Sequence, residues 1–338
     1  MKVADIGEFG LISRIAGLLP RHSAGVLVGI GDDVAVLQVS PREVLLATCD
    51  IQVEEVHFCR SWTTPRQLGR KVVAINVSDI AAMGGVPAWA LVSLALPQDT
   101  DVEFVEELYG GMQEQISEGG GAIVGGNTSA ISSRMVIDLF LMGKADPERI
   151  VRRSGARVGD LVFVTGFLGD SRAGLELMRR PELKVDPFHA DPVLERHRTP
   201  RPRLREGQCL ASSGKVHAMV DVSDGLWSDV GHICRASGVG AEIRLAELPV
   251  SDHCIEVARA ASKDFREWAL TGGEDYELLF AVAADHADEV ERMVLNETGT
   301  PCRPIGRFIA VERGVVVSTS EKDRFKTLCN TRGWDHFR

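Results

Sequence analysis

The order of hydrophobic and polar positions predicts that helices and strands alternate along this chain. Apolar residues near the start recur at helical spacing and predict a short amphipathic helix before the Pro-Arg-His break at 20–22; they are Leu11, Ile12, Ile15, Leu18 and Leu19. The segments 26–30 and 44–48 are apolar runs of strand length. Both runs lead into aspartates, Asp32 and Asp33 after the first and Asp50 after the second.

Further elements follow in the same alternating manner. A helix is expected to begin at Thr63 or Thr64, with Pro65 in its first turn, and to end at the glycines 84 and 85. We expect a second helix at 101–118 and strands at 122–124, 135–142, 159–166, 216–222, 241–245, 276–283 and 314–318. The segment 181–206 is rich in Pro, Arg and His without periodicity and indicates a long surface loop.

This pattern predicts an α/β (α+β) protein with two domains. The chain has 338 residues, which is more than one hydrophobic core usually serves. A polar connector with Pro147 occupies 143–154, so we expect an N-terminal domain at 1–145 and a C-terminal α/β domain at 150–338.

Net charge and cysteine usage exclude several classes of protein. The formal charge of −10 has the wrong sign for binding nucleic acid or an anionic membrane. The seven cysteines form no C-x-x-C pair, which favours a reduced cytoplasmic location, and we find no export signal or membrane segment. A phosphate-bearing ligand would need a local site made of backbone amides, a few Arg or Lys, or metal ions held by acidic side chains.

The common nucleotide-binding motifs are absent. The Gly-Lys pairs at 143–144 and 214–215 are followed by Ala and Val, which excludes a P-loop. A dinucleotide-binding fingerprint (G-x-G-x-x-G) would begin at Gly29-Ile30-Gly31. It is excluded because Asp32 and Asp33 follow these residues and Val34 stands where the last glycine is required. The remaining chemical signal is carried by aspartates.

Six aspartates lie beside glycine, serine or asparagine at the edges of apolar runs: Asp32, Asp33, Asp50, Asp79, Asp221 and Asp224. Any single one could be a turn residue or a helix cap. Asp79 differs, because it lies on an otherwise apolar helix, where an unpaired buried carboxylate would cost several kcal/mol. If these carboxylates converge, cations must offset their repulsion, and oxygen ligands without His or Cys indicate Mg²⁺ or Mn²⁺.

Three other segments leave two interpretations open. The segment TGGEDYELLF at 271–280 is either a solvated hairpin entrance or part of a site. His57 is either an ordinary core or surface histidine or a ligand-binding residue. The glycines at 119–126 either form a tight turn or let backbone amides approach a phosphate.

Six motifs in order resemble those of the thiamine-monophosphate kinase family. They are GIGDDVAVL (29–37), TCDIQVEEVHF (48–58), NVSDIAAMGGVPAWALVSLALP (76–97), GGNTS (125–129), DVSDGLWSDV (221–230) and TGGEDYELLF (271–280). The resemblance covers most of the chain and extends to aminoimidazole ribonucleotide synthetase, selenophosphate synthetase and a hydrogenase-maturation dehydratase. It implies a two-domain aminoimidazole ribonucleotide synthetase-like fold, a homodimer in which the N-terminal sheets of two subunits pair, and ATP and thiamine monophosphate as substrates.

The resemblance also implies roles for individual residues. Mg²⁺ ions would be held by Asp32, Cys49, Asp50, Asp79, Asn127, Asp221 and Asp224. ATP would be bound by Tyr109, Gly126, Asn127, Arg152 or Arg153, and Ser223. Thiamine monophosphate would be received by His57, Glu274 and Trp334. No catalytic side chain is implied, because a phosphate monoester is already a nucleophile at neutral pH and needs positioning and charge neutralisation.

Two departures from the family pattern leave alternatives open. The family usually has Asp where this chain has Asn127 and Thr where it has Cys49, so one metal site is expected to be weaker or differently filled. A different ATP-using enzyme of the same superfamily is one alternative, although the cysteine signatures of selenophosphate synthetase and the dehydratase are absent. A thiamine-phosphate or nucleotide-binding protein without turnover is the other.

Overall fold

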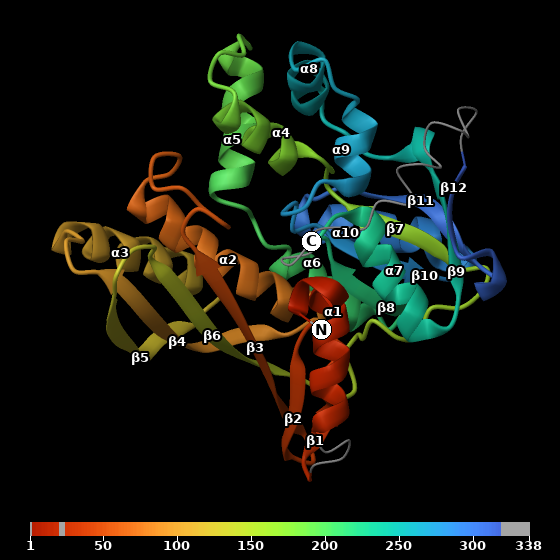
Figure 1. Cartoon of the computed structure of the whole chain (residues 1–338). Coiled ribbons are helices and arrows are strands. Elements are labelled where there is room, and N and C mark those ends of the chain that lie inside the picture. The colour runs from red at the N-terminus through yellow and green to blue at the C-terminus, as the bar shows by residue number, and fades with distance from the viewer. Residues whose placement is uncertain (1, 20–23, 319–338) are drawn as a thin grey trace.

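The computed structural model describes residues 2–19 and 24–318 and shows two α/β domains, each built on a six-stranded sheet (Figure 1). The N-terminal sheet has the order β1-β2-β3-β6-β4-β5, and the C-terminal sheet has the order β12-β9-β11-β7-β10-β8. The predicted fold class is confirmed. Among the described residues, no helix is both long and apolar enough to cross a membrane.

The N-terminal sheet is antiparallel except for the β4–β5 pair. Its strands are β1 (Val26–Val28), β2 (Ala35–Ser40), β3 (Glu43–Val53), β4 (Val86–Pro97), β5 (Ala122–Ile131) and β6 (Val136–Ala145). Helices α2 (Pro65–Ala82) and α3 (Val102–Glu118) cover one face, and α1 (Val3–Leu18) precedes the sheet. Two glycines let α2 and α3 approach closely, because a Cβ at Gly111 would lie 1.9 Å from the Arg66 carbonyl oxygen and one at Gly69 would lie 2.0 Å from that of Leu108.

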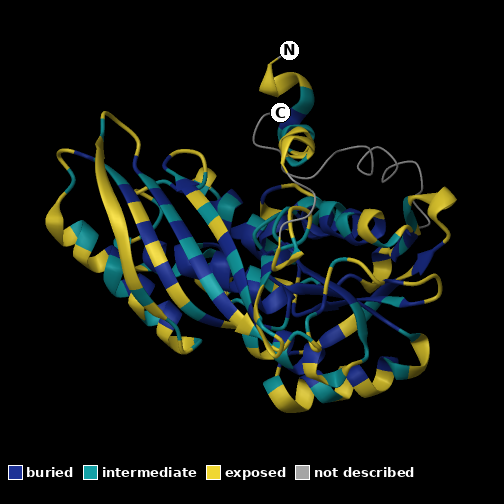
Figure 2. Ribbon diagram, turned by 90° about the horizontal axis from the view of Figure 1, so that it is seen from below, coloured by how far each residue is buried: buried dark blue, intermediate teal, exposed yellow. Residues whose placement is uncertain are grey.

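In the part of the chain that the structure describes, no helix covers the opposite face of this sheet, which we call the bare face. Figure 2 shows exposed and buried residues alternating across it, as expected for strands with one solvated face. Apolar side chains remain exposed there, among them Ile51, Trp89 and Leu91.

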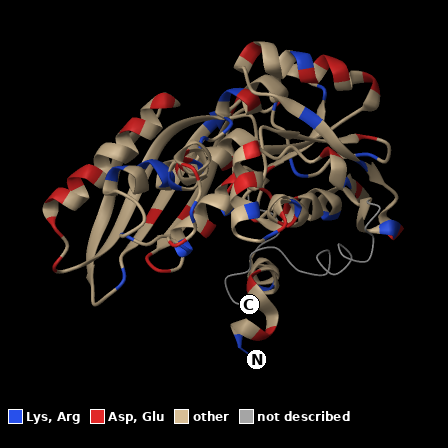
Figure 3. Ribbon diagram, turned by 90° about the horizontal axis from the view of Figure 1, so that it is seen from above, with Lys and Arg blue, Asp and Glu red and all other residues tan. Residues whose placement is uncertain are grey.

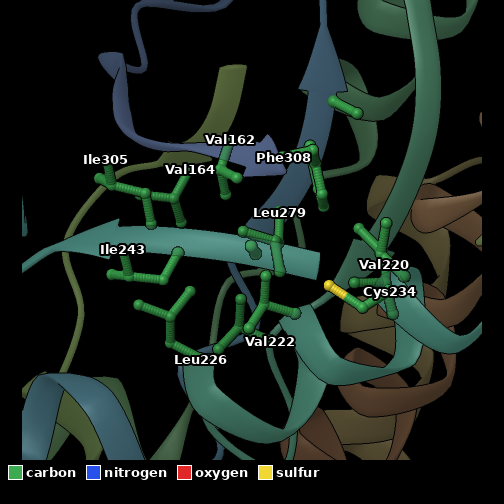
Figure 4. Packing of buried hydrophobic residues seen from close by; sticks show 14 of the residues in the cluster. Val162, Val164, Val220, Val222, Leu226, Cys234, Ile243, Leu279, Ile305 and Phe308 are labelled. Carbon is green, nitrogen blue, oxygen red and sulfur yellow. The ribbon is translucent and has the colours of Figure 1, made fainter. Parts of the chain in front are cut away.

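The C-terminal sheet is buried on both faces. Its strands are β7 (Leu161–Thr165), β8 (Val216–Asp221), β9 (Gly240–Arg244), β10 (Leu278–Val282), β11 (Cys302–Ile309) and β12 (Val315–Ser318). Helix α7 (Leu226–Ser237) packs on one face through the cluster drawn in Figure 4, and α6 (Leu204–Ser213) and α10 (Ala287–Thr298) pack on the other. Burial on both faces explains why β7 and β10 are continuous apolar runs.

Four further helices form a lobe above this sheet, at the top of Figure 1. They are α4 (Asp170–Arg179), α5 (Pro187–Arg198), α8 (Asp252–Ala260) and α9 (Phe265–Thr271), and they share a core of their own around Val193, Val257 and Trp268. The prediction of a surface loop at 181–206 was therefore wrong, because α5 and the start of α6 occupy most of it. Asp186 caps α5 by accepting a hydrogen bond from the Phe188 amide, and Pro187 occupies its first turn.

Helix α2 contacts both domains and positions the site between them. Its Leu68, Val72 and Ile80 are buried against the N-terminal sheet, while Ala82 belongs to a core cluster of the C-terminal domain. Toward its end it packs against α6, where a Cβ at Gly207 would lie 2.1 Å from the Ala81 carbonyl oxygen. The last turns of α2, which carry Ser78 and Asp79, therefore lie against the end of β8.

Candidate metal and substrate site

Three carboxylates from distant parts of the chain converge where the two domains meet. Asp33 follows β1, Asp79 lies in the last turn of α2, and Asp221 ends β8; an oxygen of each lies within 4.8 Å of the others. Figure 3 shows Asp and Glu positions gathered at this centre of the molecule as well as along the outer helices. Three of the six aspartates singled out in the sequence therefore converge in the structure: Asp33, Asp79 and Asp221.

Hydroxyl groups and one arginine orient these carboxylates. The Ser78 hydroxyl donates to Asp221 Oδ2 at 2.7 Å and the Thr48 hydroxyl donates to Asp79 Oδ2 at 2.7 Å. The Arg153 guanidinium donates to Asp33 Oδ1 at 2.5 and 3.0 Å, whereas Asp33 Oδ2 is buried and has no hydrogen-bond partner among the described residues. That unpartnered oxygen is a position at which a cation would satisfy an otherwise costly buried charge.

Burial and mutual repulsion change the protonation of this cluster. Burial raises the pKa of Asp33 to about 7, despite Arg153, and that of Asp221 to about 6. Burial, together with the nearby Asp138, raises the pKa of Asp50 to about 6. Asp79 has a pKa well above its usual range, first from burial and then from repulsion by Asp50 and Asp221. The charged cluster therefore needs a counterion at neutral pH.

A second group lies beside the first, at the turn from β8 into α7. Ligand atoms of Asp224, Asp229 and His232 lie within 4.8 Å of one another. Asp229 is 2% exposed, its Oδ2 has no hydrogen-bond partner, and burial followed by repulsion from Asp224 raises its pKa well above the usual range. Asp229 extends the acidic region beyond the predicted residues.

A pocket lies between the segment 54–64, α2 and the α4–α5 lobe. Its walls include His57, Trp62, Lys71 and His197. The His57 Nδ1 accepts a hydrogen bond from the Val53 amide at 2.9 Å, which fixes the ring. Glu274 lies beside this pocket and contacts Lys71 and His197, so two of the three predicted substrate residues are near one another.

The other predicted residues occupy different surroundings. Asp32 accepts a hydrogen bond from the Arg153 amide at 3.2 Å, and Ser223 follows β8 directly. Cys49 donates to Asp138 at 3.8 Å on the bare face of the sheet. Gly126 and Asn127 lie on the edge strand β5, where Asn127 is paired with Ser93.

Two further predicted residues, Tyr109 and Arg152, have other surroundings. Tyr109 packs against the core of the N-terminal domain, and the Arg152 side chain is exposed. Trp334 lies outside the described residues.

The residue set implied by the family resemblance left out four residues: Asp33, Asp229, Lys71 and His197. Asp33 was visible as one of the strand-end aspartates, but sequence does not tell which of two adjacent carboxylates points inward. Lys71 follows Arg70 directly before the apolar run of α2, so its position gave no distinct signal. Asp229 lies within the motif DVSDGLWSDV (221–230), whereas His197 has no local sign of a site.

Comparisons with known proteins identify the family of this chain. The family model for the N-terminal domain of AIR synthase related proteins matches residues 31–145, and the model for the C-terminal domain matches 157–319. Thiamine-monophosphate kinase from Aquifex aeolicus is 39% identical over 337 residues, covering 100% of both chains, and that from Escherichia coli strain K12 is 35% identical, covering 98% of both. The solved structure of AaThiL complexed with AMPPCP and TMP superposes with a TM-score of 0.85 at 37% identity, covering 99% of both chains.

Proposed function

Because this chain belongs to the AIR synthase related protein family, and within it to the thiamine-monophosphate kinases, we propose that it transfers the γ-phosphoryl group of ATP to thiamine monophosphate at the aspartate cluster, with Mg²⁺ bound there. The products are thiamine diphosphate and ADP. The relative solved with AMPPCP, an ATP analogue, and TMP supports this pair of substrates.

The convergence of Asp33, Asp79 and Asp221 carries the proposal of metal binding. Two carboxylates about 4 Å apart repel by ~4 kcal/mol at an effective dielectric constant of about 20. The unpartnered Asp33 Oδ2 and the absence of any Cys or His from this trio fit a hard divalent cation such as Mg²⁺, with Mn²⁺ as a substitute.

We assign the remaining roles by resemblance to the family. Metal binding is assigned to Asp32, Cys49, Asp50, Asp79, Asn127, Asp221 and Asp224, to which the geometry adds Asp33. ATP binding is assigned to Tyr109, Gly126, Asn127, Arg152, Arg153 and Ser223, and substrate binding to His57, Glu274 and Trp334. The pocket lined by His57 supports the placement of the thiamine rings beside this residue.

The residues suit a reaction controlled by position and charge. In the transfer, an oxygen of the acceptor phosphate forms a bond to the γ-phosphorus while the bond from the γ-phosphorus to the oxygen of ADP breaks. Bound Mg²⁺ supplies charge neutralisation between the two phosphate groups. The chain holds the carboxylates in place through Ser78, Thr48 and Arg153, and the acceptor needs no general base.

A turnover assay tests the proposed function. The pure protein is incubated with ATP, thiamine monophosphate and Mg²⁺, and the products are separated by chromatography. We expect thiamine diphosphate and ADP in equal amounts, and no turnover after chelation until Mg²⁺ or Mn²⁺ is restored. Full activity in metal-free buffer would reject the metal site, and binding without turnover would favour a non-catalytic binding protein.

Mg²⁺ is expected to stabilise the protein more as the pH rises. The raised pKa values of Asp33, Asp50 and Asp221 mean that the metal-free native state binds more protons than the unfolded chain, whose carboxyl pKa is about 4. The contribution of these groups to the free energy of unfolding therefore falls as the pH rises from about 4 to 7. Buried His197 and His232 have pKa values of about 3 and act in the opposite direction, so the informative quantity is the Mg²⁺-dependent increment in Tm.

The measurement is thermal unfolding with and without Mg²⁺ at several pH values between 5 and 8. The increment should be small at pH 5, where protons already neutralise the cluster, and largest at pH 8. An increment that is constant across this range would show that Mg²⁺ does not act through the aspartates.

The variant Asn127→Asp tests the departure from the family pattern. An amide oxygen can ligate Mg²⁺ but carries no formal charge, so the added carboxylate should shift the Mg²⁺ dependence of turnover to lower concentration. The midpoint is measured in a Mg²⁺ titration at saturating ATP. An unchanged midpoint would leave Asn127 as an edge-strand residue outside the metal set.

We also propose a homodimer that covers the bare face of the N-terminal sheet. Ile51, Trp89 and Leu91 are 53%, 40% and 40% exposed on this face, which is unusual for a soluble surface. The variant Leu91→Asp should shift the mass measured by light scattering from two chains to one.

A cytoplasmic location is supported by the free cysteines among the described residues, which suit a reducing compartment.

A further inference from the structure

Lys71 is a buried cation at the boundary between the two domains. It lies on α2 of the N-terminal domain and is 4% exposed, and its Nζ is 2.8 Å from Glu274 Oε1 of the C-terminal domain. A buried ammonium is costly unless it is paired, so this contact determines where both side chains lie.

The second oxygen of Glu274 is held as well. Its Oε2 lies 3.3 Å from His197 Nδ1, and that nitrogen is also 2.9 Å from the Ser171 hydroxyl. Burial lowers the pKa of His197 to about 3, so the ring is neutral and Lys71 supplies the positive charge of this group. The pKa of Glu274 is held below its usual value, against the effect of burial, chiefly by Lys71.

The backbone of Glu274 is equally constrained. Its φ of 64° lies in the left-handed region, which few non-glycine residues adopt, and its amide donates to the Ser223 carbonyl at 2.8 Å. Because Ser223 follows Asp221 on the turn after β8, the position of Glu274 is tied to the metal cluster. The side-chain contacts with Lys71 and His197 then set the direction of its carboxylate.

We propose that Lys71 is a positioning residue for substrate recognition, holding Glu274 as an ionised carboxylate at the edge of the pocket that takes the ring system of thiamine monophosphate. This inference rests on the proposed function. Both Lys71 and His197 line that pocket and contact Glu274, so the carboxylate is at its polar edge. An ionised carboxylate there accepts hydrogen bonds from the exocyclic amine of an aminopyrimidine and attracts a thiazolium cation.

The ion pair between Lys71 and Glu274 also affects the net charge that the pocket presents to a cationic substrate. The pocket wall includes Lys71 and Arg198, and a cationic ring would be repelled by an uncompensated Lys71. Arg198 keeps its positive charge, and its Nε donates to the Trp62 carbonyl at 2.7 Å. Glu274 therefore neutralises the buried lysine, and the pair presents no net positive charge to the substrate.

The test compares Lys71→Met, Glu274→Gln and the double variant with the wild type. Lys71→Met should raise the KM for thiamine monophosphate by about tenfold, as expected for a lost charged interaction, and leave the KM for ATP within about twofold. Lys71→Arg should recover part of the loss, because the charge returns in a different shape. The matched control is Arg70→Met, the next residue on α2, which makes exposed ion pairs with α3 and should change neither KM.

The double variant tests whether Lys71 acts through Glu274. In a Glu274→Gln background, Lys71→Met should cause no further rise in the KM for thiamine monophosphate. This comparison remains valid if the single Lys71→Met variant does not fold. In the double variant both members of the pair are neutral, so no buried charge is left without its partner. A further rise, or an equal change in both KM values, would overturn the positioning role. A wild-type protein without turnover would instead reject the proposed function.

Discussion

Replacing Asp79 by Asn is expected to lower kcat by a factor of about 10²–10³, since a metal ion contributes several kcal/mol to transition-state stabilisation. The amide is nearly the same size as the carboxylate and still accepts the hydrogen bond from the Thr48 hydroxyl. The variant removes one negative charge from the trio with Asp33 and Asp221, so Mg²⁺ should bind more weakly.

Steady-state kinetics at several Mg²⁺ concentrations, together with thermal unfolding of the metal-free protein, would check this expectation. The metal-free variant should be at least as stable as the wild type, because repulsion within the cluster is relieved. Wild-type activity in Asp79→Asn would show that Asp79 has a structural role only.

Arg203→Met is expected to have the largest effect on stability, about 3–5 kcal/mol, because it leaves a buried charge without its partner. The Glu277 side chain is 1% exposed and accepts hydrogen bonds from Arg203 Nε at 2.6 Å, from a second guanidinium nitrogen at 2.5 Å, and from the Thr165 hydroxyl at 2.7 Å. Urea denaturation monitored by circular dichroism gives the free energy of unfolding.

The matched control is Arg205→Met, which lies two residues after Arg203, in the first turn of α6. Arg205 is exposed and donates to the Glu297 carbonyl, so its loss should change stability by no more than about 0.5 kcal/mol. Equal stabilities of the two variants would mean that Glu277 is neutral in the folded protein and that Arg203 is not needed to compensate it.

The two-domain α/β architecture could be predicted because its main elements have strong local signals. Helix α2 has a capping threonine, a proline in its first turn and glycines at its end, and its predicted bounds agree with the structure. Helix α5 could not be recognised by periodicity. It buries only Val193 and His197, and Pro192 interrupts its pattern, so its stability depends on packing against α4 and α8.

The site was predictable as a set of aspartates but not as a geometry. Strand ends and glycine turns indicated Asp50 and Asp221, and an isolated carboxylate on an apolar helix indicated Asp79. Strand alternation places Thr48 and Asp50 on one face of the sheet and Cys49 on the other, but the sequence does not tell which of the two faces α2 covers. In the structure Thr48 and Asp50 face Asp79 of α2, and Cys49 points to the opposite face.

The division of the aspartate trio between two domains would link the proposed cation binding to any rotation of one domain against the other. Asp33 and Asp79 belong to the N-terminal domain and Asp221 to the C-terminal domain, and the Ser78–Asp221 hydrogen bond crosses between them. Rotation of one domain about the connector near 146–156 would change the distances between these oxygens. A cation that prefers one arrangement of ligands must therefore shift the population of hinge angles toward that arrangement, and the hinge must alter cation affinity by the same free energy.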